Sequence, residues 1–479
     1  EMEQGVSPFS EGGSLRFCLV YPNTYAVGAC NLGFATLFRF LNEAKDCTAE
    51  RLFALDDRRR ILEEPRSLET KRPLDEFAII AFSFMSELDY LNGAKLLENA
   101  GIPWKREDRE GEGPLILAGG AAPTLNPAPV SAMADVVVRG EWELDGPAIT
   151  KLMVQGWNEA GESQDVLEAL WSFPRAQDLE GALLLTTQAA KEPMAYLSLV
   201  PEKGVFAKMA LVEATRGCPW SCRFCSARCL YSPYRVAPAE AIFEYARKMK
   251  PYANRVGLVG AGLAARKDLV AILKQLSEEE IQASLASLRL DGVSDELLAQ
   301  LKEHGQRTVT VAPESFRPET LALLGKKPPT GGFHSCLERI LNAGFHRVKL
   351  YMMMAIPGDN PQESVELAYE TLSPLGKLAN RIELAYAIFQ PKPATSMAKE
   401  KISDHKTIKK EAKLIKKRLG SLVGSLELPG PKGALIADLL CRGGAQAMKL
   451  ALASRPKADT YEEAISQGEK WWLPLQGST

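Results

Sequence analysis

Three cysteines stand close together near the middle of the chain, and their spacing restricts what the residues around them can fold into. Cys218, Cys222 and Cys225 have three and then two residues between them and follow directly after the apolar run 207–214. An apolar run of this length predicts a strand, which places the three thiols on one loop at the strand's end. Thiolates so closely spaced typically bind an iron–sulfur cluster or zinc. If these three alone hold a four-iron cluster, one iron is left open to a substrate or cofactor.

Two other kinds of metal site also use cysteines. A structural zinc site would need a fourth ligand, for which Cys229 is the nearest candidate, but the cysteine pairs of zinc sites are normally separated by a long spacer. A ferredoxin run has two residues between successive cysteines and a further cysteine before a proline. The sequence has neither spacing, so we expect that Cys229 is not a ligand.

The pattern Cys-x-x-x-Cys-x-x-Cys, with the aromatic Phe224 just before the last cysteine, resembles the radical SAM superfamily. The resemblance implies that Cys218, Cys222 and Cys225 hold a 4Fe-4S cluster whose open iron is chelated by the amino and carboxylate groups of S-adenosylmethionine (SAM). It implies that reductive cleavage of SAM then makes a 5′-deoxyadenosyl radical. It also implies a reducing partner such as flavodoxin or ferredoxin, and a small-molecule or peptide substrate.

The region 206–395 alternates apolar runs with amphipathic segments, which predicts parallel strands alternating with helices. Six such units are too few for a closed eight-stranded barrel. They agree with the open (β/α)6 barrel of the superfamily that the cysteine motif resembles. The expected strands are 207–214, 255–259, 283–288, 308–311, 347–353 and 381–389.

Residues at the ends of these expected strands are identified with SAM binding through the same resemblance. Ser287 and Arg289 stand where family members contact the ribose and the carboxylate, and a guanidinium can clamp a carboxylate with two parallel hydrogen bonds. Glu314 is expected to accept from a ribose hydroxyl. Gly260 and Gly262 resemble the segment that lies against the methionine part of SAM. That they only form a turn at the start of a helix is an equally good interpretation. The expected SAM contacts are Phe224, Gly260, Gly262, Ser287, Arg289, Glu314 and Ile356.

The region 1–150 has a similar alternation, with short apolar runs at 15–21, 51–55, 77–82, 114–118 and 135–138. Such runs separated by amphipathic segments predict a doubly wound, Rossmann-like parallel sheet with helices on both faces. In such a sheet the ligand lies outside the carboxyl ends of the strands, at a switch point. The loops that follow the runs are therefore the candidate binding loops.

These loops resemble the cobalamin-binding domain that precedes many radical SAM enzymes. The family pattern is Asp-x-His-x-x-Gly, then Ser-x-Leu, then Gly-Gly, and this chain departs from it at the Asp and His positions. Because a tyrosine replaces the histidine, any bound cobalamin would lack an imidazole below its cobalt. The alternative is that the glycines only make tight turns and the domain is vestigial. The expected cobalamin contacts are Asn23, Tyr25, Gly28, Ser86, Leu88, Gly119 and Gly120.

The remaining segments and the composition set the wider expectations. We predict a connector over 151–205 and a helical C-terminal extension over 396–479. The net charge of −2 gives no overall attraction to nucleic acid, so we expect no such partner. No apolar run approaches the roughly 18 residues that a membrane helix needs. Clustered cysteines suit a reducing compartment, so we expect a cytoplasmic protein.

The expected function is that of a cobalamin-dependent radical SAM methyltransferase acting on an unactivated carbon. One alternative keeps the cluster and SAM but performs a cyclisation or rearrangement beside a vestigial cobalamin domain. Another is an iron–sulfur electron-transfer protein without catalysis. The sequence gives no catalytic residue beyond the cofactor ligands.

Overall fold

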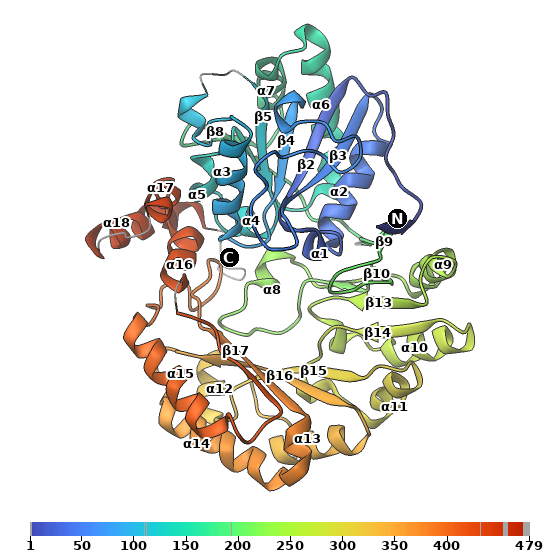
Figure 1. The fold of residues 1–479 in the computed structure, drawn as a ribbon, viewed down its shortest axis with the longest axis vertical. Helices are drawn as coiled ribbons and strands as arrows, with labels where there is room; N and C mark the ends of the chain where they lie inside the picture. Colours follow the sequence, from blue (N-terminus) through green and yellow to red (C-terminus); the bar gives the residue numbers. More distant parts are fainter. Residues whose placement is uncertain are drawn as a thin grey trace. The chain divides into compact units, whose positions relative to one another are not determined.

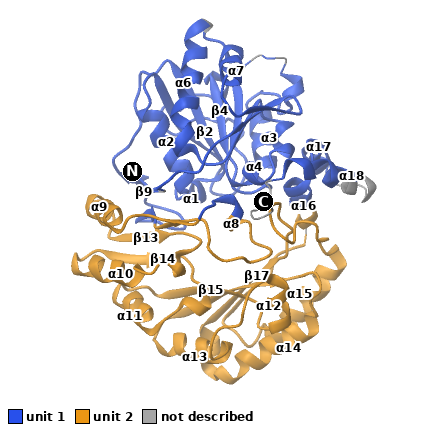
Figure 2. Ribbon diagram, turned by 180° about the vertical axis from the view of Figure 1, so that it is seen from behind, with its two compact units in different colours: residues 1–213, 229–233, 436–479 blue, residues 214–228, 234–435 orange. Residues whose placement is uncertain are grey.

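The computed structural model describes residues 2–109, 111, 113–192, 194–431, 433–453 and 458–472. Contacts divide the chain into two compact units (Figure 2). The first contains the residues up to Glu213, the short stretch Cys229–Pro233 and the residues from Ile436 onward. The second contains Ala214–Arg228 and Tyr234–Leu435. The boundaries at 150, 205 and 395 remain predictions about domains, and this division does not coincide with them.

The first unit is built on a seven-stranded sheet (Figure 1). All neighbouring strands in it are parallel except the last pair, β8 and β7. The predicted doubly wound α/β fold is therefore confirmed. The strands, in spatial order, are β3 (Cys47–Leu55), β2 (Leu15–Thr24), β4 (Ile79–Ser83), β5 (Leu115–Gly119), β6 (Val136–Arg139), β8 (Ala182–Thr186) and β7 (Ala176–Leu179).

The strand order reverses direction at β2. The chain passes from β2 outward to β3 and then returns to the other side of β2 to form β4. The crevice outside the carboxyl ends of β2 and β4 is thus the switch point, where open α/β sheets bind their ligands. The loops that the sequence singles out, after Thr24 and after Ser83, begin at this place.

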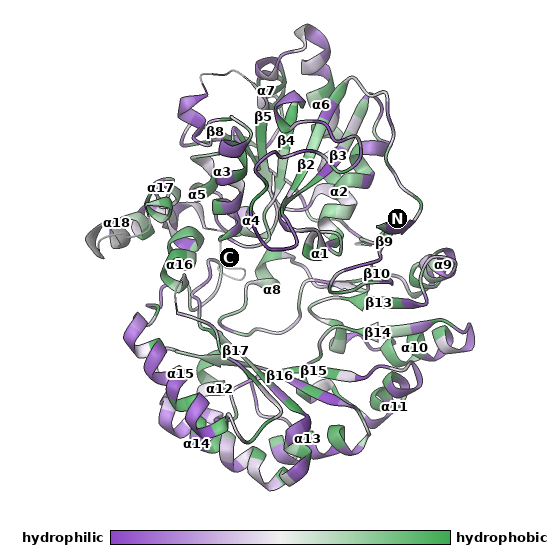
Figure 3. Cartoon of the chain, in the orientation of Figure 1, coloured by the Kyte–Doolittle hydropathy of each residue, from purple (hydrophilic) through white to green (hydrophobic). Residues whose placement is uncertain are grey.

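Both faces of the sheet are covered, and for this reason its strands are apolar along nearly their whole length (Figure 3). Val20 and Phe82 belong to one core with side chains of α3 and α17, whereas Leu19 and Leu117 belong to the opposite core with side chains of α2 and α6. The helices of this unit are α1 (Tyr25–Gly28), α2 (Leu32–Glu43), α3 (Asp89–Asn99), α4 (Ala121–Leu125), α5 (Ala128–Ser131), α6 (Trp142–Ala160), α7 (Ser163–Trp171), α16 (Ala434–Arg442), α17 (Gln446–Leu452) and α18 (Ala458–Gly468).

The segment 151–205 differs from the predicted connector. Its first half continues α6 and forms α7, and β8 pairs with β6 to extend the sheet. The short strand β9 (Leu199–Pro201) pairs with β1 (Glu3–Gly5). The sequence did not indicate that β8 joins the seven-stranded sheet, because the partner of a short apolar run depends on tertiary contacts and not on the run's own pattern.

The C-terminal helices pack within the first unit. Leu439, Leu440 and Met448 lie in the same core as Tyr90 of α3. The side-chain amide of Asn126 donates to the carbonyl oxygens of Cys441 and Gly443, at 3.1 and 2.8 Å. The described part of the segment from Ile436 onward therefore completes one face of the doubly wound unit.

The second unit contains parallel strands that alternate with helices. Strand β13 (Arg255–Val259) pairs with β14 (Gln282–Leu285), and a parallel bridge from Leu288 to Val311 leads to the next strand. Strands β15 (Thr308–Glu314), β16 (Arg347–Met354), β17 (Ile382–Ile388) and β18 (Ser425–Glu427) then follow side by side, all parallel. This arrangement is that of an open α/β barrel.

Helices follow these strands along the chain and lie outside them (Figure 1). They are α9 (Ala239–Met249), α10 (Leu269–Glu278), α11 (Asp295–Glu303), α12 (Pro318–Leu324), α13 (Phe333–Asn342), α14 (Pro361–Leu372) and α15 (His405–Leu419). The remaining elements are the strand β10 (Met209–Glu213), the paired strands β11 (Thr215–Arg216) and β12 (Arg235–Val236), and the short helix α8 (Ala227–Leu230).

One histidine is a buried structural element of the second unit. His304 is only 2% exposed. Its Nδ1 accepts from the backbone N–H of Ala283 at 3.0 Å, and its Nε2 lies 2.9 Å from the carbonyl oxygen of Leu273. This pattern requires the neutral ring with its proton on Nε2, because Nδ1 is an acceptor. Burial lowers the pKa of His304, and of the charged groups nearby, Glu303 raises this pKa and Arg255 lowers it.

We predict that this histidine makes the protein less stable in mild acid. Because its folded-state pKa is depressed, the unfolded chain takes up a proton first as the pH falls, so its contribution is complete above about pH 6.5 and decreases below that value. Urea unfolding at pH 7.5, 6.5 and 5.5 should show a smaller acid loss in His304→Gln than in the parent. The exposed His346→Gln variant is the control and should behave like the parent. Equal pH slopes in all three proteins would contradict the assignment.

Candidate functional site

The three cysteines lie on a loop of the second unit that begins directly after β11. Its base is fixed by backbone contacts: the N–H of Ala214 donates to Val259, and Arg266 Nη1 donates to the carbonyl oxygens of Ala214 and Ala237, each at 2.8 Å. Gly217 then turns the chain with a φ of +76°, a conformation that a residue with a side chain rarely adopts. The cysteine loop therefore leaves the strand from a fixed position.

Arg223, which directly follows the second cysteine, joins the loop to two other segments of the chain. The N–H of Arg223 donates to the carbonyl oxygen of Leu324 at 2.9 Å, and its own carbonyl oxygen accepts from the N–H of Met397 at 3.2 Å. Its side chain donates to the carbonyl oxygen of Leu323 at 3.2 Å. The end of α12 and the segment around Met397 thus position the stretch that carries Cys222 and Cys225.

Phe224, which directly precedes the third cysteine, packs against the core of the second unit. Its ring packs against a small buried cluster made of Leu324, Ile356, Phe389 and Met397. Two residues that the sequence assigned to the SAM site, Phe224 and Ile356, are therefore brought together. Because Phe224 is only partly buried, this contact contributes less than the roughly 1.5–3 kcal/mol of a fully buried side chain, but it still anchors the loop next to Cys225.

All three thiols are free and partly exposed. Burial raises the pKa of the Cys218 and Cys225 thiols, and the neighbouring cysteines add to this effect. Thiolates in this position need a compensating positive charge, which a metal centre supplies.

The chemistry of the donors is what links these three thiols to a cluster. Three thiols stand on one loop, with three and then two residues between them. Cysteine thiolates are the usual ligands of iron–sulfur clusters, so the donor set fits a cluster. Among the described residues, no group of three histidine, cysteine or acidic side chains is placed to share a single metal ion.

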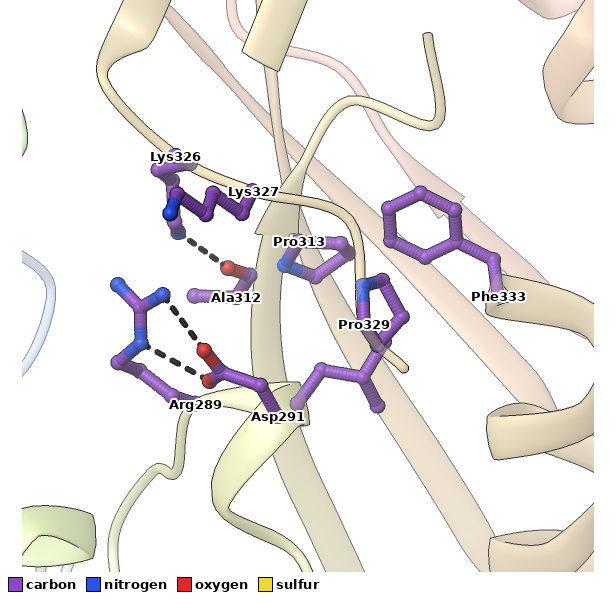
Figure 4. A pocket seen from close by; sticks show the side chains of 9 residues that line it. Arg289, Asp291, Ala312, Pro313, Lys326, Lys327, Pro329 and Phe333 are labelled. Atoms are coloured by element: carbon purple, nitrogen blue, oxygen red, sulfur yellow. Dashed lines mark hydrogen bonds and ion pairs between the residues drawn. The ribbon is translucent and has the colours of Figure 1, made fainter. Parts of the chain in front are cut away.

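Charged residues at neighbouring strand ends lie next to the cysteine loop. Arg289 Nη1 is 3.7 Å from Cys222 Sγ, and its guanidinium carbon lies 4.6 Å from the centre of the Trp220 ring. Its Nε and Nη2 donate to the two carboxylate oxygens of Asp291 at 2.9 and 2.8 Å (Figure 4). The predicted SAM residue Arg289 is thus brought to the cysteines, while Ser287 is exposed two residues before it.

Glu314 ends strand β15 with a φ of +67°, an uncommon conformation for a residue with a side chain. Its carboxylate is 3.1 Å from Lys326 Nζ, which also donates to the carbonyl oxygen of Ala312 (Figure 4 shows Lys326 with Ala312). Burial raises the pKa of Glu314, and Lys326 and then Arg289 act in the opposite direction. The same two cations lower the pKa of the Cys218 thiol, so this acid–base pair borders the cysteine loop.

The glycine pair after β13 packs against the base of the cysteine loop. A Cβ at Gly260 would lie 2.6 Å from the carbonyl oxygen of Thr215. A Cβ at Gly262 would lie 2.9 Å from Pro219 Cδ and 2.5 Å from the ring of Tyr234. The Tyr234 hydroxyl also donates to the carbonyl oxygen of Gly262 at 3.1 Å. Both glycines are therefore needed for close approach to the chain on either side of Cys218.

The residues expected to contact cobalamin lie at the switch point of the first unit, and most of them have partners in the protein. The Tyr25 hydroxyl lies 3.1 Å from Met2 O and 3.1 Å from Glu3 Oε1. The Asn23 amide donates to Asp89 at 3.3 Å. A Cβ at Gly28 would lie 2.6 Å from the Phe53 ring.

The glycine loop after β5 is joined to the loop after β4. The N–H of Phe84 donates to the carbonyl oxygen of Gly119 at 2.8 Å, and a Cβ at Gly120 would meet the Phe84 backbone, with its nitrogen only 2.9 Å away. Beneath these loops, Phe84 stacks on Phe82 and meets Tyr90 edge-on. The layer between the sheet and α3 is thus filled by aromatic rings.

Above the same edge, large apolar side chains face outward. Val27 after β2, and Met85 and Leu88 after β4, are 38%, 38% and 40% exposed. Exposed apolar groups gathered at a ligand-binding edge indicate a surface that a flat apolar ligand can cover. Apolar side chains of this kind can pack against the ring face of a corrin, and the rings of Phe82, Phe84 and Tyr90 pack together beneath them.

Three contributors to the cysteine site were not found from the sequence. Asp291 and Lys326 are ordinary surface residue types that pair with Arg289 and Glu314, and Met397 lies in a proline-rich stretch far along the chain. A charged residue two positions after Arg289 was visible in the sequence, but no pattern indicated that the two side chains pair.

Comparisons with known proteins agree with this geometry. Residues 212–368 match the radical SAM superfamily, and residues 33–176 match the family of radical SAM proteins' N-terminal domains. The chain therefore belongs to the radical SAM superfamily and carries an N-terminal domain of the kind found in such proteins.

A relative of this chain is the uncharacterized protein MJ0966 of Methanocaldococcus jannaschii, 25% identical over 406 residues that cover 83% of each chain. Two structures of TsrM, a radical S-adenosylmethionine methyltransferase from Kitasatospora setae, share the fold at 13% identity. One, with cobalamin and a 4Fe-4S cluster bound, has a TM-score of 0.53 and is matched over 80% of this chain and 76% of that chain. The other, with tryptophan substrate and a SAM analogue bound, has a TM-score of 0.54 and is matched over 80% of this chain and 74% of that chain.

Within the described residues, no helix has the length and apolar character needed to cross a membrane.

We predict that Gly260→Ala displaces the base of the cysteine loop. The added methyl would press on the Thr215 backbone, and overpacking of this kind costs about 1–3 kcal/mol. Iron content after anaerobic reconstitution, together with the melting temperature, measures the effect, and both should fall. Gly430→Ala is the matched control, because a Cβ there meets nothing within 4 Å. Full iron content and an unchanged melting temperature in Gly260→Ala would refute the proposed packing.

Proposed function

We propose that this radical SAM enzyme is a cobalamin-dependent methyltransferase that acts on an unactivated carbon. The observation that supports this most directly is the exposed apolar edge at the switch point of the first unit, made of Val27, Met85 and Leu88. The TsrM structures share the fold over 80% of this chain, and one of them contains both cobalamin and a cluster. The rest of the proposal follows from what each set of residues can bind.

In the second unit, Cys218, Cys222 and Cys225 would hold a 4Fe-4S cluster. When bound, the cluster would supply the electron for SAM cleavage, and cobalamin would supply the methyl group. The protein's part is to bind and orient these groups and to exclude water from them. A flavodoxin or ferredoxin is the proposed source of electrons, and the substrate is a small molecule or a peptide.

SAM would be bound by the residues around the cysteine loop. Ile356 and the partly buried Phe224 belong to one apolar cluster on which adenine can pack, and Glu314 can accept a hydrogen bond from a ribose hydroxyl. Ser287 is exposed beside them and can donate or accept. Arg289 retains N–H groups beyond those that it shares with Asp291 and Cys222, because a guanidinium has five donors.

Cobalamin would lie with its ring face on the apolar edge of the first unit. The chain's four histidines are at positions 304, 334, 346 and 405, all within the second unit, so the first unit contributes no imidazole to cobalt. Tyr25, which stands at the histidine position of the family pattern, is already engaged with Met2 and Glu3.

The second candidate is a radical SAM enzyme that cyclises or rearranges its substrate and has a vestigial cobalamin domain. The packed contact of Gly120 with Phe84 favours it, because the glycine loop then serves the protein's own packing. Corrin binding separates this candidate from the first.

SAM cleavage tests the shared part of both candidates. Anaerobically reconstituted protein, reduced with dithionite in the presence of SAM, should form 5′-deoxyadenosine, and Cys222→Ala should form none. Chromatography with mass spectrometry measures the product. If the parent holds a full cluster and yet forms no 5′-deoxyadenosine, the protein is an electron carrier and both enzyme proposals fail.

Corrin retention tests the cobalamin part. Protein produced with cobalamin supply should keep the corrin absorption after gel filtration, and Leu88→Glu should lose it because a charge would face the apolar ring. Leu144→Glu, at another exposed leucine of the same unit, is the matched control and should retain the corrin. A parent protein that retains no corrin would leave the second candidate as the function.

A further inference from the structure

Arg289 contacts two residues of the cysteine loop, Trp220 and Cys222. The preceding Leu288 is fixed by its N–H, which donates to the carbonyl oxygen of Thr310 at 2.9 Å, so the arginine leaves the sheet at a defined point. From there its guanidinium lies over the Trp220 ring, with Nη1 3.7 Å from Cys222 Sγ. Both contacted residues belong to the loop that carries the metal-binding thiols.

The two N–H groups of Arg289 that could bind a carboxylate side by side, on Nε and Nη2, already bind Asp291. Nε and Nη2 donate to the two oxygens of Asp291, and this pairing directs Nη1 toward the sulfur (Figure 4 shows the pair). The Arg289 side chain is 17% exposed and that of Asp291 is 41% exposed. The partly buried guanidinium is therefore held by a bidentate ion pair on one side and an aromatic ring on the other.

The charges at this place are balanced in pairs. Arg289 is paired with Asp291, and Lys326 is paired with Glu314. Because each cation has its own carboxylate, the net charge near the cysteines from these four residues is small. What remains specific to Arg289 is the direct N–H contact with Cys222.

We propose that Arg289 is a positioning residue that donates a hydrogen bond to the Cys222 thiolate when the cluster is bound, and that this bond raises the cluster's reduction potential. Hydrogen bonds to cluster sulfurs stabilise the added negative charge of the reduced form, which makes reduction easier. Asp291 and Trp220 orient the donor. The inference rests on the proposed cluster site and adds to it the residue that tunes the site.

The test is a redox titration of the reconstituted protein, followed by EPR of the reduced cluster. Arg289→Gln should hold a full complement of iron and have a more negative midpoint potential than the parent. Arg289→Lys should show a similar negative shift, because a lysine keeps the charge but cannot bind Asp291 with two parallel hydrogen bonds and also reach the sulfur. A parent-like potential in Arg289→Lys would overturn the hydrogen-bond explanation in favour of simple charge.

Asp291→Asn provides a second route if an Arg289 variant binds iron poorly. It leaves the arginine in place but removes the ionised carboxylate that orients it, so the potential should again become more negative. Arg255→Gln is the matched control: this arginine of the same unit bonds to Ala283 and Gln282, and its replacement should leave the potential unchanged.

The titration also distinguishes this inference from a role in SAM binding. A weaker apparent affinity for SAM in Arg289→Gln, with an unchanged potential measured without SAM, would assign the residue to SAM and contradict the inference. In that case the cluster and its proposed chemistry would stand. A parent protein that binds no iron would overturn the proposed function and, with it, this inference.

Discussion

The hydrogen bonds on the two sides of Arg223 are the constraint on which the cysteine site depends. They join the chain between Cys222 and Cys225 to the end of α12 and to the segment at Met397, which are about 100 and 170 residues further along the sequence. Without these contacts the loop would be a free segment with three exposed thiols. With them, the loop is joined to two other segments, and Phe224 packs against the apolar cluster that contains Leu324 and Met397.

The same physical logic applies in the first unit, where close backbone approach also determines the loops. Gly120 packs on Phe84, and Phe82, Phe84 and Tyr90 fill the layer below with their rings. Packed aromatic rings therefore lie beneath the switch point, and the exposed apolar side chains of Val27, Met85 and Leu88 lie at its outer edge. This arrangement suits a ligand that lies on the edge, and such a ligand would be held mainly by the burial of apolar surface.

The sequence predicted the fold well because its strongest signals are local. Buried runs such as Phe77–Phe82 and Arg347–Met353 have the length and composition of parallel strands, and the structure forms β4 and β16 there. The cysteine spacing indicated a cluster loop, and the family resemblance that it carries indicated the neighbours Phe224, Ile356 and Arg289. The pairing of β8 with β6 and the packing of Met448 beside Tyr90 were not predictable, because they join segments with no shared local pattern. For the same reason Asp291 and Lys326 were missed: a side chain's partner depends on tertiary contacts that residue type does not reveal.

The central claim is that three cysteines hold a cluster with one iron open to SAM. EPR of the dithionite-reduced, reconstituted protein, recorded without and then with saturating SAM, tests it most directly. The account predicts the signal of a reduced four-iron cluster whose g values change when SAM is added, because SAM becomes a ligand of the open iron. A four-iron signal that is identical with and without SAM would contradict the account.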